Sequence, residues 1–160
     1  VGLLLAAVWW VWIYTSWCTN WLDPEHVPVR TALFVLMLAG LLMSASIPQA
    51  FGERGLAFAA AYVFMQVGRT LFFLWAVRGE AANMRRNFQR IALWLSLAGV
   101  FWIAGGLAQD DTRLGLWAVA LGIEVISPAL YFWVPGLGRS SVQDWNVDTG
   151  ARVWTHEYPT

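Results

Sequence analysis

Residues 57–77 read AFAAAYVFMQVGRTLFFLWAV. The run is long enough to cross a bilayer as an α-helix, which rises about 1.5 Å per residue. Arg69 lies near its middle, where a charged side chain costs roughly 3 kcal/mol on membrane-insertion scales. A second charge lies deep in an apolar segment at Glu124. Because a buried charge needs a compensating group, we expect a helical bundle built around residues 57–77 and the group that compensates the charge of Arg69.

The composition is that of a membrane protein. Of the 160 residues, 59% are hydrophobic and 12% are charged, whereas soluble domains average about 25% charged residues. The net charge is zero, so no basic surface indicates a nucleic-acid partner. Cys18 is the single cysteine, and His26 and His156 both lie outside the apolar segments. We therefore expect no disulfide, no metal site and no cofactor.

Charged residues divide the chain into five apolar segments of about 20 residues, each of the length that a spanning helix requires. The segments cover residues 1–22, 31–50, 56–77, 90–108 and 114–134. Strands of a membrane barrel alternate apolar and polar residues, and these segments do not. The sequence predicts an all-α fold, a polytopic transmembrane bundle of about five helices over residues 1–134. A cytoplasmic juxtamembrane tail, residues 135–160, is expected to follow, and the lipid bilayer is the first predicted partner.

Two prolines make local predictions. Pro48 is expected to end the second span, with Gly52 beyond it. Pro128 lies inside the fifth span, four residues after Glu124, where it should kink the helix and free the backbone carbonyl of Glu124. The kink is interpreted either as a packing feature or as the shape of a site near Glu124.

The arginines predict the orientation. The connections after the first, third and fifth spans contain Arg30; Arg78, Arg85, Arg86 and Arg90; and Arg139 and Arg152. The opposite side has only Arg54 and Arg113. By the positive-inside rule, the Arg78–Arg90 link and the tail face the cytoplasm. Binding of these arginines to anionic headgroups requires the same orientation.

A polar helix face is the candidate functional site. Tyr62, Gln66 and Arg69 are spaced by four and three residues, so they share one face of the third span. In a membrane this face must look into protein or water. We expect Arg69 to pair directly with Glu124, with Gln66 taking a remaining hydrogen bond. The centre is interpreted either as a structural pair that fixes helix register, or as a proton or ion relay or substrate anchor.

Several motifs resemble the bacterial low temperature requirement A (LtrA) family. They are residues 9–15 (WWVWIYT), 19–25 (TNWLDPE), 47–55 (IPQAFGERG), 66–70 (QVGRT), 102–106 (WIAGG) and 132–140 (FWVPGLGRS). The resemblance runs from about Trp9 to Asp148. It implies a multi-pass bacterial inner-membrane protein, and the family name records growth in the cold without implying a substrate or reaction.

The chain departs from the family pattern at both ends. Family members usually begin with another span that carries a Phe-Phe-Asp-Leu-type motif, and they continue past an Asp-Trp element, matched here by Asp144 and Trp145, into further spans. We therefore expect this sequence to be an internal or truncated piece. Its further partners are predicted to be other membrane helices, from the flanking spans or from a second copy.

Three functional classes remain open. The leading hypothesis is a transport-like or membrane-adaptation function with Arg69, Glu124, Gln66 and Tyr62 at a buried polar centre. The alternative is a structural or interaction subunit of a membrane complex. A membrane enzyme ranks third, because no phosphate loop, nucleophile motif or zinc signature is present.

The orientation leads to a labelling experiment. An Ala82→Cys variant in a Cys18→Ser background should resist membrane-impermeant thiol reagents in intact cells and react after the cells are opened, because Ala82 lies in the arginine-rich link. Rapid labelling in intact cells would reverse the topology.

Overall fold

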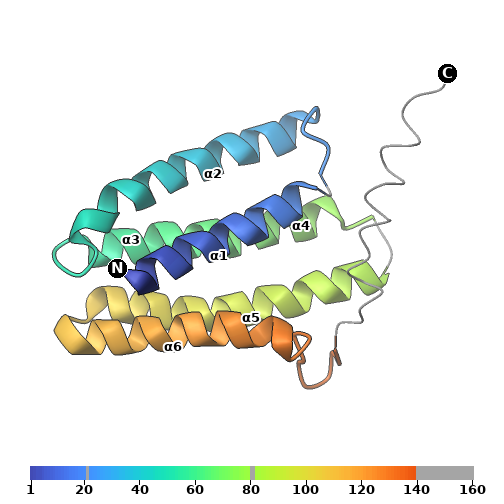
Figure 1. Cartoon of the computed structure of the whole chain (residues 1–160). Coiled ribbons are helices and arrows are strands. Elements are labelled where there is room, and N and C mark those ends of the chain that lie inside the picture. Colours follow the sequence, from blue (N-terminus) through green and yellow to red (C-terminus); the bar gives the residue numbers. More distant parts are fainter. Residues whose placement is uncertain (21, 80–81, 140–160) are drawn as a thin grey trace.

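The computed structural model describes residues 1–20, 22–79 and 82–139, and in these ranges the chain forms helices and no strand. The elements are α1 (Gly2–Thr19), α2 (Val27–Ser46), η1 (Ile47–Gln49), α3 (Gly55–Val63), η2 (Phe64–Gly68), α4 (Arg69–Ala76), α5 (Ala82–Leu107) and α6 (Asp110–Ala129). Because α3, η2 and α4 follow one another without a break, they form one rod. Five rods therefore run up and down beside one another (Figure 1).

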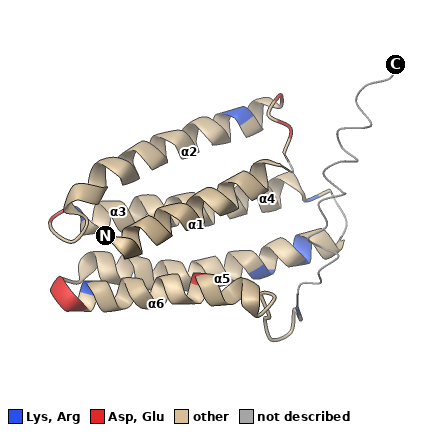
Figure 2. Cartoon of the chain, viewed as in Figure 1, with Lys and Arg blue, Asp and Glu red and all other residues tan. Residues whose placement is uncertain are grey.

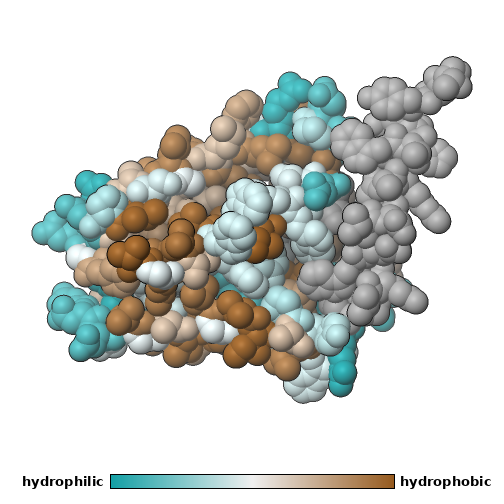
Figure 3. Space-filling model, in the orientation of Figure 1, coloured by the Kyte–Doolittle hydropathy of each residue, from teal (hydrophilic) through white to brown (hydrophobic). Residues whose placement is uncertain are grey.

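Four of the five rods are long and apolar enough to cross a membrane: α1, α2 with η1, the α3–η2–α4 rod, and α5. The fifth, α6, begins with Asp110 and Asp111 and carries Arg113 and Glu124, which lower its mean hydropathy. Most of the charged ribbon lies toward the two ends of the bundle, with one red segment near its middle (Figure 2), and apolar patches alternate with paler residues on the face between the ends (Figure 3). The predicted all-α membrane bundle is confirmed.

Several span boundaries differ from the prediction, and the largest differences are at the start of α5 and the end of α6. Helix α5 begins at Ala82 rather than near residue 90, so most of the arginine-rich link forms the first turns of this helix. Helix α6 ends at Ala129 rather than 134, because the chain turns at Tyr131 and Phe132, both with positive φ. Pro48 lies in the 3₁₀ turn that closes α2, as predicted. Most of the predicted tail, residues 140–160, including Asp144 and Trp145, lies outside the described residues.

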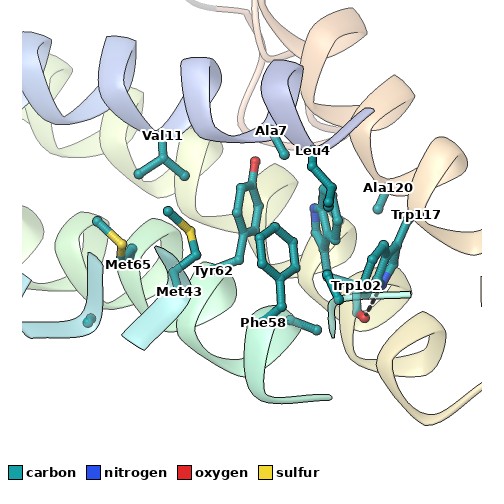
Figure 4. Packing of buried hydrophobic residues seen from close by; sticks show 14 residues of the cluster. Leu4, Ala7, Val11, Met43, Phe58, Tyr62, Met65, Trp102, Trp117 and Ala120 are labelled. Carbon is teal, nitrogen blue, oxygen red and sulfur yellow. Dashed lines mark hydrogen bonds between the residues drawn. The ribbon is translucent and has the colours of Figure 1, made fainter. Parts of the chain in front are cut away.

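Aromatic side chains fill one end of the bundle. Phe58 and Tyr62 of the third rod pack against Trp102 of α5 and Trp117 of α6, with ring centroids 4.4 Å apart for Tyr62 and Trp102. The indole of Trp117 donates a hydrogen bond of 3.0 Å to the carbonyl of Trp102. Leu4, Ala7 and Val11 of α1 lie over this cluster (Figure 4). A second cluster, which includes Phe73 and Phe88, fills the other end.

Glycines of α5 allow the third rod to approach closely. A Cβ added at Gly106 would lie 3.0 Å from the Cα of Leu56 and 3.0 Å from the Cβ of Ala59. Close backbone approach through small residues is a recurrent way of packing helices in membranes, where lipid is as apolar as the helix surface. The α3–α5 crossing therefore depends on the absence of a side chain at this position.

Gly106→Ala should destabilise the bundle by about 1–3 kcal/mol, because a backbone atom cannot rotate away from the added methyl group. The matched control is Gly115→Ala on α6, where an added Cβ meets nothing within 4 Å. Thermal unfolding of the purified variants in one detergent measures both, and equal midpoints for the two variants would contradict the close crossing.

Candidate functional site

The third rod changes its winding at the polar centre. Residues Phe64–Gly68 form a π-helical turn, η2, between α3 and α4. Gln66 lies inside this turn and Arg69 follows it directly. The hydroxyl of Thr70 donates 2.7 Å to the carbonyl of Gln66 and so adds a partner to the wide turn. Turns of this kind are rare in helices and are frequent at functional sites.

Glu124 of α6 is held by three donors from three other elements. Its Oε2 accepts from the hydroxyl of Tyr62 at 2.5 Å and from Nε2 of Gln66 at 3.3 Å. Its Oε1 accepts from the indole Nε1 of Trp102 at 3.0 Å. The side chain is 1% exposed. A buried carboxylate is tolerated where hydrogen bonds replace those of water, and α3, η2 and α5 supply them here.

Arg69 is 4% exposed and binds neutral acceptors. Nη1 donates to the Thr15 hydroxyl at 2.9 Å and to the Val11 carbonyl at 3.4 Å, both on α1. Nη2 donates to Oε1 of Gln66 at 2.5 Å. The guanidinium also lies 5.5 Å from the ring centroid of Tyr14. Nε has no hydrogen-bond partner among the described residues.

The predicted direct pair of Arg69 and Glu124 is wrong. Gln66 lies between them, with its carbonyl oxygen accepting from Arg69 and its amide nitrogen donating toward Glu124. A primary amide suits this place, because one end accepts from a cation and the other donates to an anion. The four predicted residues Tyr62, Gln66, Arg69 and Glu124 are thus brought together, but in a chain rather than as an ion pair.

Pro128 lies inside α6, as the sequence implied, and it cannot donate to the carbonyl of Glu124. The hydroxyl of Ser127 donates 2.9 Å to that carbonyl instead. The carbonyl expected to be free is therefore satisfied within its own helix, and the break in the backbone ladder lies directly beside the buried carboxylate.

Sequence reasoning missed two structural arginines. Arg113 is buried and donates to the carbonyls of Ala50, Gly52, Gly105 and Ala108, so it ties the α2–α3 loop to the end of α5. Arg90 donates from Nε and Nη2 to the carbonyl of Leu137 and holds the turn after α6 against α5. One signal was present for Arg113: a cation in the first turns of a helix opposes the helix dipole, so it needs another reason to be there.

Comparison with known proteins identifies the family. The sequence pattern described as bacterial low temperature requirement A protein (LtrA) matches residues 1–151. The chain belongs to this family. An uncharacterized protein of Rhizobium meliloti (strain 1021) is 45% identical over 147 residues, which cover 91% of this LtrA-family chain and 36% of the relative. The chain thus spans about a third of that relative's length. No solved structure matches this chain with statistical significance.

The family resemblance and the geometry coincide at the polar centre. The motif at residues 66–70 contains Gln66, Arg69 and Thr70, and the motif at residues 102–106 begins with Trp102. The first supplies the central amide and the cation, and the second supplies a donor to Glu124.

Gln66→Leu should destabilise the LtrA-family chain more than an ordinary apolar replacement. The change leaves Nη2 of Arg69 and Oε2 of Glu124 each short of a partner, and each unsatisfied buried group costs about 1–3 kcal/mol. Met65→Leu in the same turn is the control, because a volume-conserving swap costs less than about 1.5 kcal/mol. Equal thermal midpoints for the two variants would show that Gln66 does not connect the charges.

Proposed function

We propose that this LtrA-family chain is part of a multi-pass inner-membrane transport protein in which Glu124, held in the polar centre, takes up and releases the proton that crosses the bundle. The observation that carries the proposal is the hydrogen-bonded chain Glu124–Gln66–Arg69–Thr15. It is buried between helices that are apolar enough to span a membrane.

The chain of side chains extends along the bundle axis. Tyr62 and Arg69 are seven positions apart on one rod, which corresponds to about 10 Å along a helix. Glu124 lies at the Tyr62 end and Thr15 lies at the Arg69 end. Proton relays in membrane proteins are built on buried carboxylates such as Glu124, and the fixed charge of Arg69, which neither gains nor loses a proton, sets the electrostatic environment of that carboxylate. The arginine-rich link at the start of α5 supports a cytoplasmic position for the Arg69 end.

A specific observation favours a second candidate function, that of a structural or interaction subunit. Three donors occupy the two oxygens of Glu124, an arrangement that can fix helix register without moving protons. In addition, α2 exposes Phe34, Met37, Leu38 and Leu41, an apolar face able to pack against further helices. In this alternative, Arg69 and Glu124 hold the helices together and no proton moves between them.

Proton flux separates the two candidates. The purified chain, reconstituted into potassium-loaded liposomes with a luminal pH dye, should accelerate the decay of an imposed pH gradient when valinomycin is present. Glu124→Gln should return the decay to the rate of empty liposomes, because the amide cannot release a proton. Asp111→Asn is the matched control on the same helix, since this carboxylate is exposed and should leave the flux unchanged.

The Rhizobium meliloti relative provides the full-length arm of the experiment, because the present chain covers 36% of it. A gradient decay no faster than that of empty liposomes for both folded proteins would refute the relay and support the structural alternative. Equal flux in the Glu124→Gln and Asp111→Asn variants would also refute it.

A further inference from the structure

An apolar groove runs along α2, and Arg69 lines it toward one end. One cavity of about 490 Å³ lies between the first half of α2 and the η2–α4 part of the third rod, lined among others by Pro28, Ala32, Gly68 and Arg69. Small-molecule sites typically measure about 300–1,000 Å³. Arg69 is the charged residue among those that line it.

A second cavity continues the first. It also measures about 490 Å³ and lies between the second half of α2 and α3, where Ala57, Ala60 and Ala61 leave room. Val35 and Phe64 line both cavities, so the two are neighbours along α2. The distance along the rod from Arg69 to Ala57 corresponds to about 18 Å at the rise of a helix. The groove is therefore long and apolar, with a cation toward one end.

Arg69 lines this groove, and three of the five N–H donors of its guanidinium have partners. Nη1 donates to Thr15 and Val11 of α1, and Nη2 donates once, to Gln66. Nε is buried and has no partner among the described residues. Moreover, none of the acceptors that Arg69 binds is charged. A buried cation with a free donor is complemented by an anionic acceptor, which makes a stronger hydrogen bond than a neutral group does.

We propose that the groove binds a long-chain fatty acid, with its carboxylate on Nε of Arg69 and its acyl chain along α2 past Phe64. Two features favour a single-chain carboxylic acid over a phospholipid. The two cavities that make up the groove follow one another along α2, which suits one acyl chain. In addition, Arg69 lies nine residues, or about 13 Å of helix, from Arg78 at the end of the rod, and a phosphate headgroup would have to leave the interface to reach it. A carboxylic acid enters hydrocarbon in its neutral form.

The binding assay uses palmitate as the probe. The purified chain in non-ionic detergent is titrated with palmitate, and the species with one bound molecule is followed by native mass spectrometry. Hexadecanol and phosphatidylglycerol are titrated in parallel, because the alcohol has the same chain without the charge and the lipid has an anionic headgroup on two chains. Palmitate should saturate at one molecule and bind at least about tenfold more tightly than hexadecanol, the factor expected for a charge-assisted hydrogen bond.

Two variants test the two halves of the site. Gly68→Leu places a side chain in the groove without removing a bond of Arg69, and an added Cβ there meets only the ring of Phe64, at 3.7 Å or more. It should abolish palmitate binding. Arg69→Gln should reduce the affinity for palmitate to that for hexadecanol. Gly115→Leu on α6 is the control, because Gly115 is exposed and remote from the groove, and it should bind palmitate as the unaltered chain does.

Three outcomes would overturn the proposal. The first is equal affinity for palmitate and hexadecanol, which would mean that the carboxylate is not recognised. The second is full palmitate binding by Gly68→Leu, which would place the ligand elsewhere. The third is saturable binding of phosphatidylglycerol with none of palmitate, which would make the groove a phospholipid site. Because Gly68→Leu leaves Glu124 and its donors unchanged, its effect is distinguishable from failure of the relay.

Discussion

The buried charge of Arg69 is the constraint on which the bundle depends. A guanidinium in the interior of a membrane bundle requires acceptors on several sides, and the chain supplies them from α1 through Thr15 and Val11 and from η2 through Gln66. Gln66 also donates a hydrogen bond to Glu124 of α6, and Glu124 in turn accepts one from Trp102 of α5. One polar network thus connects four of the five rods. Lipid offers no hydrophobic drive for helix association, so directional bonds of this kind determine which faces meet.

The apolar packing on either side makes this network possible. The aromatic cluster around Tyr62 and Trp102 excludes water from one side of Glu124, and the cluster around Phe73 and Phe88 lies beyond Arg69. Gly105, where an added Cβ would lie within 2.4 Å of the ring of Trp117, lets α5 lie close to α6, and across this contact the indole of Trp102 donates to the carboxylate of Glu124. Hydrogen bonds in such a dry environment are electrostatically stronger than in water, and a buried donor or acceptor without a partner is correspondingly costly.

The sequence was sufficient for the helical fold and it indicated Tyr62, Gln66, Arg69 and Glu124, but it did not indicate Thr15 of α1 or Trp102 of α5, which belong to the same network. Segment lengths gave the helices, and the spacing of Tyr62, Gln66 and Arg69 placed them on one face. The order of contacts was not predictable. The position of Gln66 between the charges depends on the π-helical turn, and no propensity in residues 64–68 indicates that turn. The roles of Arg113 and Arg90 were missed for a related reason: their acceptors are backbone carbonyls from distant segments, which a side-chain pattern does not reveal.

Arg69 belongs to two environments at once, and this links the proposed relay to the proposed ligand site. Its Nη atoms are part of the chain that leads to Glu124, while its Nε is the free donor of a residue that lines the groove along α2. In the proposed binding mode, an anion at Nε would partly neutralise the charge of the guanidinium and so weaken its hydrogen bonds to Gln66 and Thr15. If the ionised and the neutral form of Glu124 favour different arrangements of Arg69, the two forms would then bind the ligand with different affinities. By linkage, the ligand would shift the equilibrium between the two forms by the same factor. The amide of Gln66 is the element through which such coupling has to pass, since it is the side chain that binds both charged residues.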